Sequence, residues 1–208
     1  MSVQLLNCDC MEYMATLPDK AFDLAIVDPP YGIGMSGGNV GYKGANDLPR
    51  KEWDSTIPPP EYFIELLRVS ENQIIWGGNY FGTLWPTRGY VVWDKGAGFR
   101  DRTYAESELA WTSFDRNAKT YARDPLACGD YHGKIHPTQK PVKLYDWLLK
   151  HYAKPGQKIL DTHLGSGSSA IAAHYFGCDF IGCELDPDYY KAACERFDRE
   201  TRQQAMAI

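Results

Sequence analysis

The sequence predicts a single α/β domain in which a mostly parallel β-sheet is covered by helices on both faces. Short apolar segments rich in β-branched residues, which suit buried strands, alternate along the chain with segments of helical periodicity. Prolines stand at expected helix starts, at Pro60, Pro141 and Pro187. A length of 208 residues is typical of one domain with a substantial core, so residues 1–208 are expected to form a single unit.

Seven strands are expected, with helices between them. The strand segments are residues 3–6, 22–27, 73–76, 90–93, 107–112, 158–160 and 179–183. The helical segments are residues 10–17, 60–69, 141–152 and 166–176 and the segment that Pro187 opens. Two regions without sustained periodicity, residues 32–60 and 113–135, are expected to be long loops, and such loops are often functional.

The composition argues against several classes of protein. No run of eighteen apolar residues exists, which argues against a membrane span, and the N-terminus lacks the basic start and apolar core of a secretory signal. The six cysteines lie in apolar or strand-like surroundings, so reduced thiols of a cytoplasmic protein are expected. Cys8 and Cys10 have no second ligand pair at zinc spacing, so no metal site is expected.

The charge is distributed unevenly along the chain. The net charge of −5 argues against a protein that coats nucleic acid indiscriminately. Residues 95–143, however, contain nine Lys and Arg against six Asp and Glu, a local balance of +3. A positive middle segment on an acidic protein fits a local face that contacts phosphates, although a merely solvated surface explains the same counts.

A stiff corner follows the second expected strand, at Asp28, Pro29, Pro30 and Tyr31. The prolines fix φ and remove backbone donors, so a carboxylate, carbonyls and an aromatic ring are held at the carboxyl end of a strand. Acceptors such as Asp28 and the Pro29 carbonyl suit an exocyclic amine, because they favour the pyramidal nitrogen that forms as it attacks. Tyr31 offers a stacking face for a base taken out of its helix. For the motif alone, an ordinary strand-to-loop turn is an equal alternative.

A glycine-rich turn between a strand and a helix, at residues 159–170, predicts a second site. Gly165 and Gly167 let the backbone approach a ligand closely, and Glu184, nineteen residues after Gly165, can take two ribose hydroxyls. The segment also satisfies the dinucleotide pattern G-x-G-x-x-A, so a nicotinamide oxidoreductase is a competing interpretation. Against it, little chain follows to build a second mononucleotide half, and Asp161 suits an ammonium or sulfonium better than a pyrophosphate.

Together, D-P-P-Y and D-T-H-L-G-S-G-S-S-A resemble motifs of the S-adenosylmethionine-dependent amino-methyltransferases of DNA. The motif order, catalytic first and cofactor last, is similar to their circularly permuted β group. Further segments resemble the family in the same order: I-I-W-G-G-N-Y-F (74–81), V-V-W-D-K (91–95), E-L-A-W (108–111), H-P-T-Q-K-P (136–141) and F-I-G-C-E-L-D-P (180–187). The likeness extends from about Val3 to Tyr190.

This resemblance implies a Rossmann-like methyltransferase fold of seven strands with an antiparallel edge, and it implies roles for individual residues. The residues expected to bind and activate the target base are Asp28, Pro29, Pro30 and Tyr31. The residues expected around the cofactor are Asp9, Asp28, Thr138, Lys140, Asp161, His163, Gly165, Ser166, Gly167, Ser168, Glu184 and Leu185. Thr162 and His163 replace the Pro and Phe common in the family, and His163 is expected to keep a planar contact rather than to act in catalysis.

The expected function is direct transfer of a methyl group from S-adenosylmethionine to the N6 amine of a flipped adenine in double-stranded DNA, without a metal. In the family, D-P-P-Y usually accompanies adenine N6 and S-P-P-Y cytosine N4. Residues 32–60 and 113–135 are the candidate DNA-recognition regions. The alternatives are transfer to cytosine N4, RNA or a protein glutamine amide, a nicotinamide oxidoreductase, and a non-catalytic DNA-binding subunit. A homodimer, a restriction endonuclease partner and a bacterial or phage origin are options that the resemblance leaves open.

Overall fold

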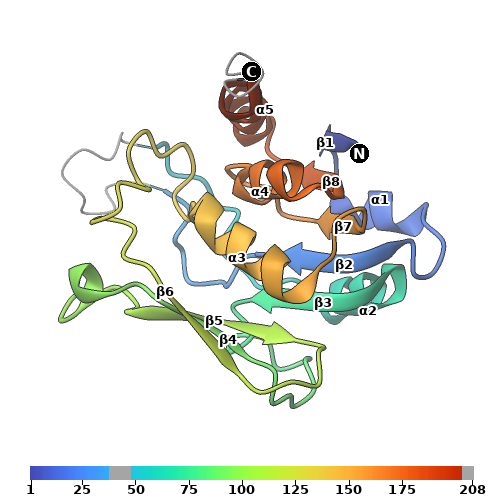
Figure 1. Cartoon of the computed structure of the whole chain (residues 1–208), viewed down its shortest axis with the longest axis horizontal. Helices are drawn as coiled ribbons and strands as arrows, with labels where there is room; N and C mark the ends of the chain where they lie inside the picture. The colour runs from blue at the N-terminus through green and yellow to red at the C-terminus, as the bar shows by residue number, and fades with distance from the viewer. Residues whose placement is uncertain (38–47, 203–208) are drawn as a thin grey trace.

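The structure, a computed structural model, describes residues 1–37 and 48–202 (Figure 1). Its elements in chain order are β1 (Val3–Asn7), α1 (Cys10–Ala15), β2 (Phe22–Val27), α2 (Pro60–Val69), β3 (Ser70–Trp76), β4 (Val91–Asp94), the 3₁₀ turn η1 (Ala97–Phe99), β5 (Ser107–Thr112), β6 (Lys119–Ala122), α3 (Val142–Tyr152), β7 (Lys158–Asp161), α4 (Ser168–Phe176), β8 (Asp179–Glu184) and α5 (Pro187–Arg202).

The strands of the described residues form one eight-stranded sheet in the order β1-β8-β7-β2-β3-β5-β4-β6. Only β5 runs against its neighbours, β3 and β4, and all other pairs are parallel. The expected α/β fold with a mostly parallel sheet is therefore confirmed. The circularly permuted motif order stays a prediction from the sequence.

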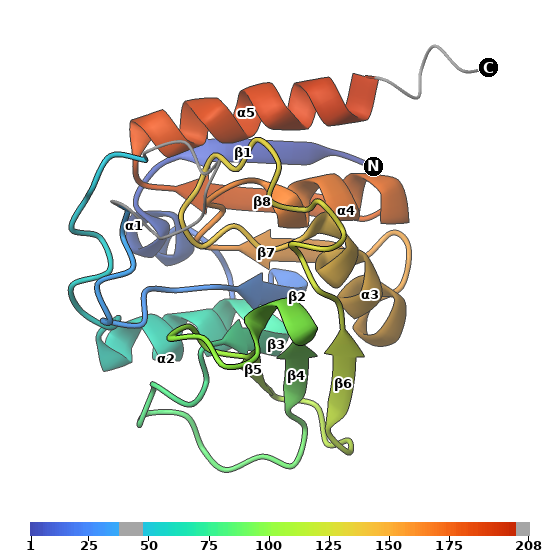
Figure 2. The ribbon, with the colours of Figure 1, turned by 90° about the vertical axis from the view of Figure 1, so that its left-hand side faces the viewer.

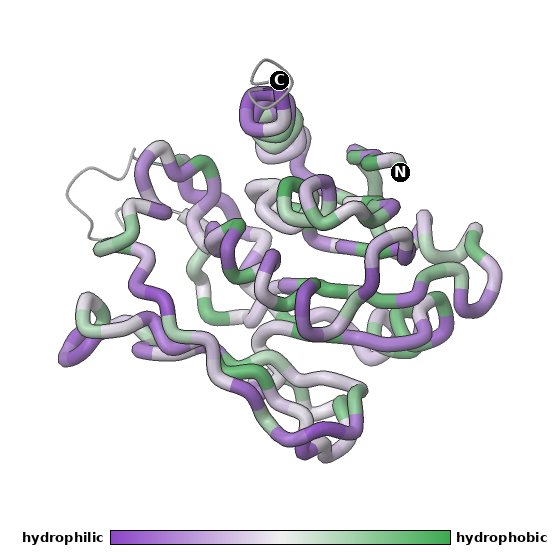
Figure 3. Tube along the Cα trace, viewed as in Figure 1, coloured by the Kyte–Doolittle hydropathy of each residue, from purple (hydrophilic) through white to green (hydrophobic). Residues whose placement is uncertain are grey.

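Helices cover both faces of the sheet (Figure 2). Alternate residues of β2 point to opposite faces, as the two-residue period of a strand requires. Leu24 and Ile26 pack in one core with residues of α3 and α4, whereas Ala25 and Val27 pack in the other with residues of α2. Burial on both sides explains the unbroken apolar run of this strand. Figure 3 shows the corresponding contrast between hydrophobic central strands and a largely hydrophilic α5.

The positions of β2 and β7 bring two distant sequence segments together. The two strands are parallel neighbours in the middle of the sheet. From β2 the chain crosses through α2 to β3, and from β7 it crosses through α4 to β8 on the other side. The loops after these strands diverge at such a topological switch point and leave the crevice in which open α/β sheets bind ligands. Asp28 and the glycine turn after Asp161 therefore meet at one edge.

The structure corrects two expectations about the sheet. It contains an eighth strand, β6, inside the segment expected to be irregular, where alternate residues are half-buried and exposed along the sheet edge. The antiparallel strand is also not at the edge, because β5 lies between β3 and β4, and the edge strand β6 is parallel to β4. A four-residue edge strand buries little apolar surface, so its sequence carries a weak signal.

The remaining differences are small shifts at element ends. α3 begins at Val142 with Pro141 as its N-cap, α4 begins at Ser168 after the left-handed Gly167, and α1 ends at Ala15. Of the expected loop over residues 32–60, residues 38–47 lie outside the described part. Within the described ranges, no helix has the length and apolar character to cross a membrane.

Candidate active site

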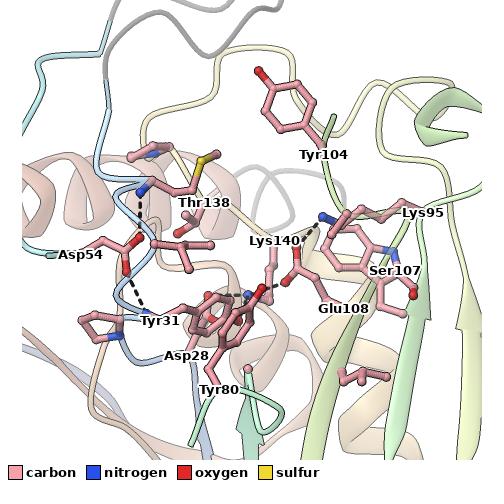
Figure 4. Close-up of a pocket in the computed structure, with 18 of the residues that line it drawn as sticks. Asp28, Tyr31, Asp54, Tyr80, Lys95, Tyr104, Ser107, Glu108, Thr138 and Lys140 are labelled. Atoms are coloured by element: carbon pink, nitrogen blue, oxygen red, sulfur yellow. Dashed lines mark hydrogen bonds and ion pairs between the residues drawn. The ribbon is translucent and has the colours of Figure 1, made fainter. Parts of the chain in front are cut away.

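The Asp28 carboxylate lies at the carboxyl end of β2 and is held by two partners. Its Oδ1 accepts a hydrogen bond of 2.5 Å from the Tyr31 hydroxyl, and its Oδ2 lies 2.5 Å from Lys140 Nζ. Lys140 also donates to the Tyr31 hydroxyl at 3.3 Å. Burial raises the pKa of Asp28, and the Lys140 ammonium opposes that rise. Figure 4 shows these three side chains pointing toward one another.

Two further charges extend this cluster along β5 and β4. Glu108 lies 3.1 Å from Lys140 Nζ through Oε2 and 2.6 Å from Lys95 Nζ through Oε1. Burial alone would raise the pKa of Glu108, but Lys140 and Lys95 outweigh it and lower the pKa to about 2. Burial likewise disfavours the Lys140 ammonium, yet Asp28 and Glu108 raise its pKa above the ordinary value. The cluster is therefore an alternating row of acidic and basic groups, in which each buried side chain has a neighbour of opposite charge type.

A cavity of about 440 Å³ opens beside Asp28 and Tyr31. Part of its wall comes from β4, η1, β5 and the segment between β6 and α3, and includes Trp93, Phe99 and Lys134. A second, much smaller cavity of about 20 Å³ is lined by His163 and Gly165 from the turn after β7. Asp28, Thr138 and Lys140 line both cavities, so the D-P-P-Y corner stands between them.

The Tyr31 ring is fixed by its neighbours. It stacks on Tyr80, with ring centroids 5.0 Å apart and planes 13° apart, and meets Phe81 edge-on at 6.2 Å. Gly77 has a φ of +73°, and a Cβ there would lie 2.2 Å from Tyr31 Cε1. A glycine is therefore needed at residue 77, because the ring occupies the space of a side chain.

Asp54 holds the backbone of the same corner. Its Oδ1 accepts hydrogen bonds from the backbone N–H groups of Tyr31 and Gly32, at 2.7 and 2.9 Å, and its Oδ2 accepts from that of Met35 at 2.7 Å. This buried carboxylate satisfies three donors of a segment without secondary structure. No pattern in the sequence distinguished it from other loop acids.

At the end of β7, Asp161 organises the glycine turn. The side chain is 1% exposed, and it accepts hydrogen bonds from the Ser169 hydroxyl at 2.6 Å and from the His163 backbone N–H at 3.0 Å. Burial raises the pKa of Asp161 to about 7. The carboxylate thus caps the turn and lies where a cation would stabilise its ionised form.

Glu184, at the end of β8, supports the turn from the other side. Its Oε2 accepts from the Gly165 backbone N–H at 2.8 Å, and its Oε1 accepts from the Asp186 N–H at 3.0 Å. Each carboxylate oxygen keeps a further lone pair for a hydroxyl group. Burial raises the pKa of Glu184 above its ordinary value.

The His163 ring packs as a planar group beside the turn. Its Nδ1 lies 2.9 Å from the Thr162 hydroxyl, and its ring meets Tyr62 edge-on with centroids 5.3 Å apart. Burial lowers the pKa of His163 to about 4, so the ring is neutral at pH 7. This environment fits the expected planar contact, which stays a prediction.

The residues around the small cavity are chemically suited to S-adenosylmethionine. Asp161 and Glu184 hold the turn that lines this cavity. The buried Asp161 carboxylate matches the ammonium group, and Glu184 matches ribose hydroxyls. The positive φ of Gly165 and Gly167 gives the turn a backbone shape that brings no side chain toward the ligand. Among the described residues, no group of three or more His, Cys, Asp or Glu side chains could hold a metal ion.

Several expected cofactor residues make other contacts. Asp9 caps α1 by accepting from the Met11 N–H at 2.7 Å, and Leu185 is 70% exposed. The Thr138 hydroxyl contacts His136 Nδ1 at 3.2 Å. Ser168 donates to the Lys140 carbonyl, and its hydroxyl lies 3.2 Å from that of Ser166. Lys140 pairs with Asp28 and Glu108 and lines both cavities, and Thr138, Ser166 and Ser168 also line the small one.

Residues 51–54 connect the D-P-P-Y corner with the start of α5. Lys51 pairs with Asp186 at 2.5 Å and with Asp188 at 2.9 Å. Trp53 stacks on His136 with centroids 5.2 Å apart, and His136 meets Tyr189 edge-on at 4.4 Å. The sequence predicted no individual role for these residues, nor for Lys95, Glu108 and Lys134. The available signals were the family-like segments that contain Lys95, Glu108, His136 and Asp186, and the positive segment 95–143 that contains Lys95 and Lys134.

Comparison with known proteins places this architecture in a family. The family model for DNA methylases of the N6/N4 type matches residues 76–195. YubD of Escherichia coli (strain K12), which is named as a methylase, is 28% identical over 93% of this chain and 89% of its own length. The type II methyltransferase M2.DpnII of Streptococcus pneumoniae is 28% identical over 82% of this chain, which spans 57% of that relative.

Solved structures show the same fold at low identity. The M1.HpyAVI complex with S-adenosylmethionine has a TM-score of 0.63 and 18% identity, over 94% of this chain and 99% of that one. The cytosine-N4-specific PvuII DNA methyltransferase has a TM-score of 0.60 and 13% identity, over 97% of this chain and 91% of that one. The matched family model covers more than half of the sequence, and the chain therefore belongs to the DNA methylase family, the S-adenosylmethionine-dependent amino-methyltransferases that its motifs resemble.

Proposed function

We propose that this DNA methyltransferase methylates the exocyclic N6 amine of adenine in double-stranded DNA, after the base is flipped out of the helix. One observation carries the proposal: Asp28 lies on the boundary between a cavity of about 440 Å³ and the smaller cavity at the glycine turn. An amine bound in the larger cavity and a methyl donor held against the glycine turn would meet at this carboxylate.

The residues of the corner provide the means to activate the amine. When bound, S-adenosylmethionine supplies an electrophilic methyl group. Asp28 Oδ1, now paired with the Tyr31 hydroxyl, can accept an N–H of the amine and favour the pyramidal nitrogen of the transition state. The raised pKa of Asp28 makes it a suitable acceptor for the proton that the nitrogen loses. The Pro29 carbonyl is the second acceptor, and alignment of the amine supplies much of the rate.

Lys140 complements the base edge next to the amine. Its Nζ lies 2.5 Å from the carboxylate that would accept from the amine, so it can donate to the neighbouring ring nitrogen when it gives up its 3.3 Å hydrogen bond to the Tyr31 hydroxyl. Adenine N1 and cytosine N3 both fit this donor. The preference for adenine therefore rests on Asp28, because D-P-P-Y usually accompanies adenine N6 in the family. Residues 32–37, 48–60 and 113–135 are proposed to face the DNA, while a homodimer and an endonuclease partner stay predictions.

Product analysis tests this proposal. The protein is incubated with methyl-labelled S-adenosylmethionine and unmethylated duplex DNA, and the digested nucleosides are separated. We expect label in N6-methyladenine, and little transfer to the same DNA after exhaustive prior methylation. Label in N4-methylcytosine would show that the target base is cytosine and not adenine. Label only in RNA or protein, when these are offered, would show that DNA is not the substrate.

A further inference from the structure

Lys134 is a buried lysine on the wall of the larger cavity. It lies in the segment between β6 and α3 and is 8% exposed. Its Nζ lies 4.3 Å from the centroid of the Tyr131 ring. Over residues 1–37 and 48–202, no carboxylate lies within 4.0 Å of this ammonium, and it makes no hydrogen bond.

The two other lysines of the cavity are placed differently. Lys95 pairs with Glu108, and Lys140 pairs with both Asp28 and Glu108. Asp54, the remaining acid of the wall, is engaged by three backbone N–H groups. In the described part of the chain, Lys134 is therefore the cation of this cavity that lacks a counter-charge.

Keeping this ammonium in the wall is energetically unfavourable for the free protein. Burial lowers the pKa of Lys134 to about 8, Glu108 opposes the shift, and Lys95 and Lys140 add to it. The group is still mostly protonated at pH 7. A face of Tyr131 compensates for only part of the lost hydration. An anion bound in the cavity would compensate for much more.

We propose that Lys134 binds the backbone phosphate of the target nucleotide when the base occupies the cavity. The Watson–Crick edge of the base is already served by Asp28 and Lys140, and the phosphodiester is the anionic group that a flipped nucleotide carries with it. This inference rests on the proposed binding of a flipped DNA nucleotide. It makes Lys134 a substrate-binding residue outside the D-P-P-Y and cofactor motifs.

Salt dependence of the Lys134→Met variant tests the phosphate contact. Methionine keeps the length of the side chain and removes its charge. We expect KM for DNA to rise on the order of tenfold at low salt with little change in kcat, as for loss of one charge-assisted hydrogen bond. We also expect the slope of log KM against log salt to become shallower by about 0.9. Lys158→Met, at an exposed site at the start of β7, is the matched control and should change neither quantity.

A neutral methylphosphonate at the target nucleotide provides an independent test. For the wild-type protein, KM for this DNA should rise by the same factor. For Lys134→Met, the methylphosphonate should cause no further rise in KM. An equal rise in KM for both proteins on the methylphosphonate DNA, or an unchanged salt slope for Lys134→Met, would overturn the proposal. Lys134 would then contact the base or serve only in packing. Melting temperatures of both proteins are compared as well, and a Lys134→Met variant that unfolds would show that the lysine is structural. Absence of methylation by the wild type on either DNA would instead contradict the proposed function.

Discussion

At the scale of single residues, a row of four ionisable side chains sets the electrostatics of the proposed active site. The row consists of Asp28, Lys140, Glu108 and Lys95. A buried carboxylate left alone would take up a proton and lose its value as an acceptor. Lys140 opposes the rise in the pKa of Asp28 that burial causes, and Glu108 holds Lys140 from the far side. The row pairs two acidic with two basic side chains, which lowers the cost of burying them, while its end at Asp28 stays available to an amine.

Asp161 should make the free energy of unfolding decrease as the pH rises. The pKa of Asp161 is about 7 in the folded protein against 3.8 ordinarily, so the folded state binds this proton more strongly than the unfolded state. The contribution of Asp161 to the free energy of unfolding is therefore fully present below about pH 4 and decreases as the pH rises to about 7. In Asp161→Asn this decrease should vanish, as measured by urea unfolding at pH 5 and pH 7.5.

Asp115→Asn is the control for this experiment, because Asp115 is exposed and its ion pair is with Arg88, which is also exposed. It should keep the wild-type dependence between the two pH values. A wild-type protein that is more stable at pH 7.5 than at pH 5, by an amount that Asp161→Asn leaves unchanged, would refute the assignment.

At the scale of elements, strands with apolar runs were predictable, including the edge strand β1, and the polar edge strand β6 was not. The run Leu24–Val27 identified β2 because both faces of that strand are apolar. β6 carries Lys119 and Thr120 at an edge, where one side of the strand faces solvent and packing imposes little pattern. The same limit applies to β5, whose antiparallel direction depends on long-range pairing with β3 and β4 rather than on its own residues.

Gly77, just after β3, makes room for the ring of Tyr31. Gly77→Ala should push Tyr31 from its stacked position, because the added Cβ meets the ring at 2.2 Å. We expect a loss of methylation and a decrease in the free energy of unfolding of more than about 1 kcal/mol, the cost of Ala at positive φ alone. Gly156→Ala has the same left-handed strain at φ +84° with open space around its Cβ, and should lower stability without affecting methylation. Equal effects of both variants on the methylation rate would argue against a role for the ring position.

At the scale of the whole molecule, the sheet order explains why two distant motifs make one site. β2 and β7 are neighbours, and their crossovers leave in opposite directions, so the D-P-P-Y corner and the glycine turn face each other. The sequence could reveal each motif, since prolines and glycines impose local geometry. It could not reveal the pairing of Lys140 with Asp28, or of Asp54 with the Tyr31 backbone, because those contacts join loops with no periodic pattern.

The central claim is that Asp28 activates the amine at the junction of the two cavities. The measurement that tests it most directly is the single-turnover rate of methyl transfer by wild type and Asp28→Asn, with S-adenosylmethionine affinity determined by calorimetry on the same samples. The amide keeps the shape of the side chain but loses the charge and one acceptor. We expect cofactor affinity to stay within a few-fold and the rate to fall on the order of 10²-fold or more, as for other losses of transition-state stabilisation. Transfer at the wild-type rate with normal cofactor affinity would contradict the account.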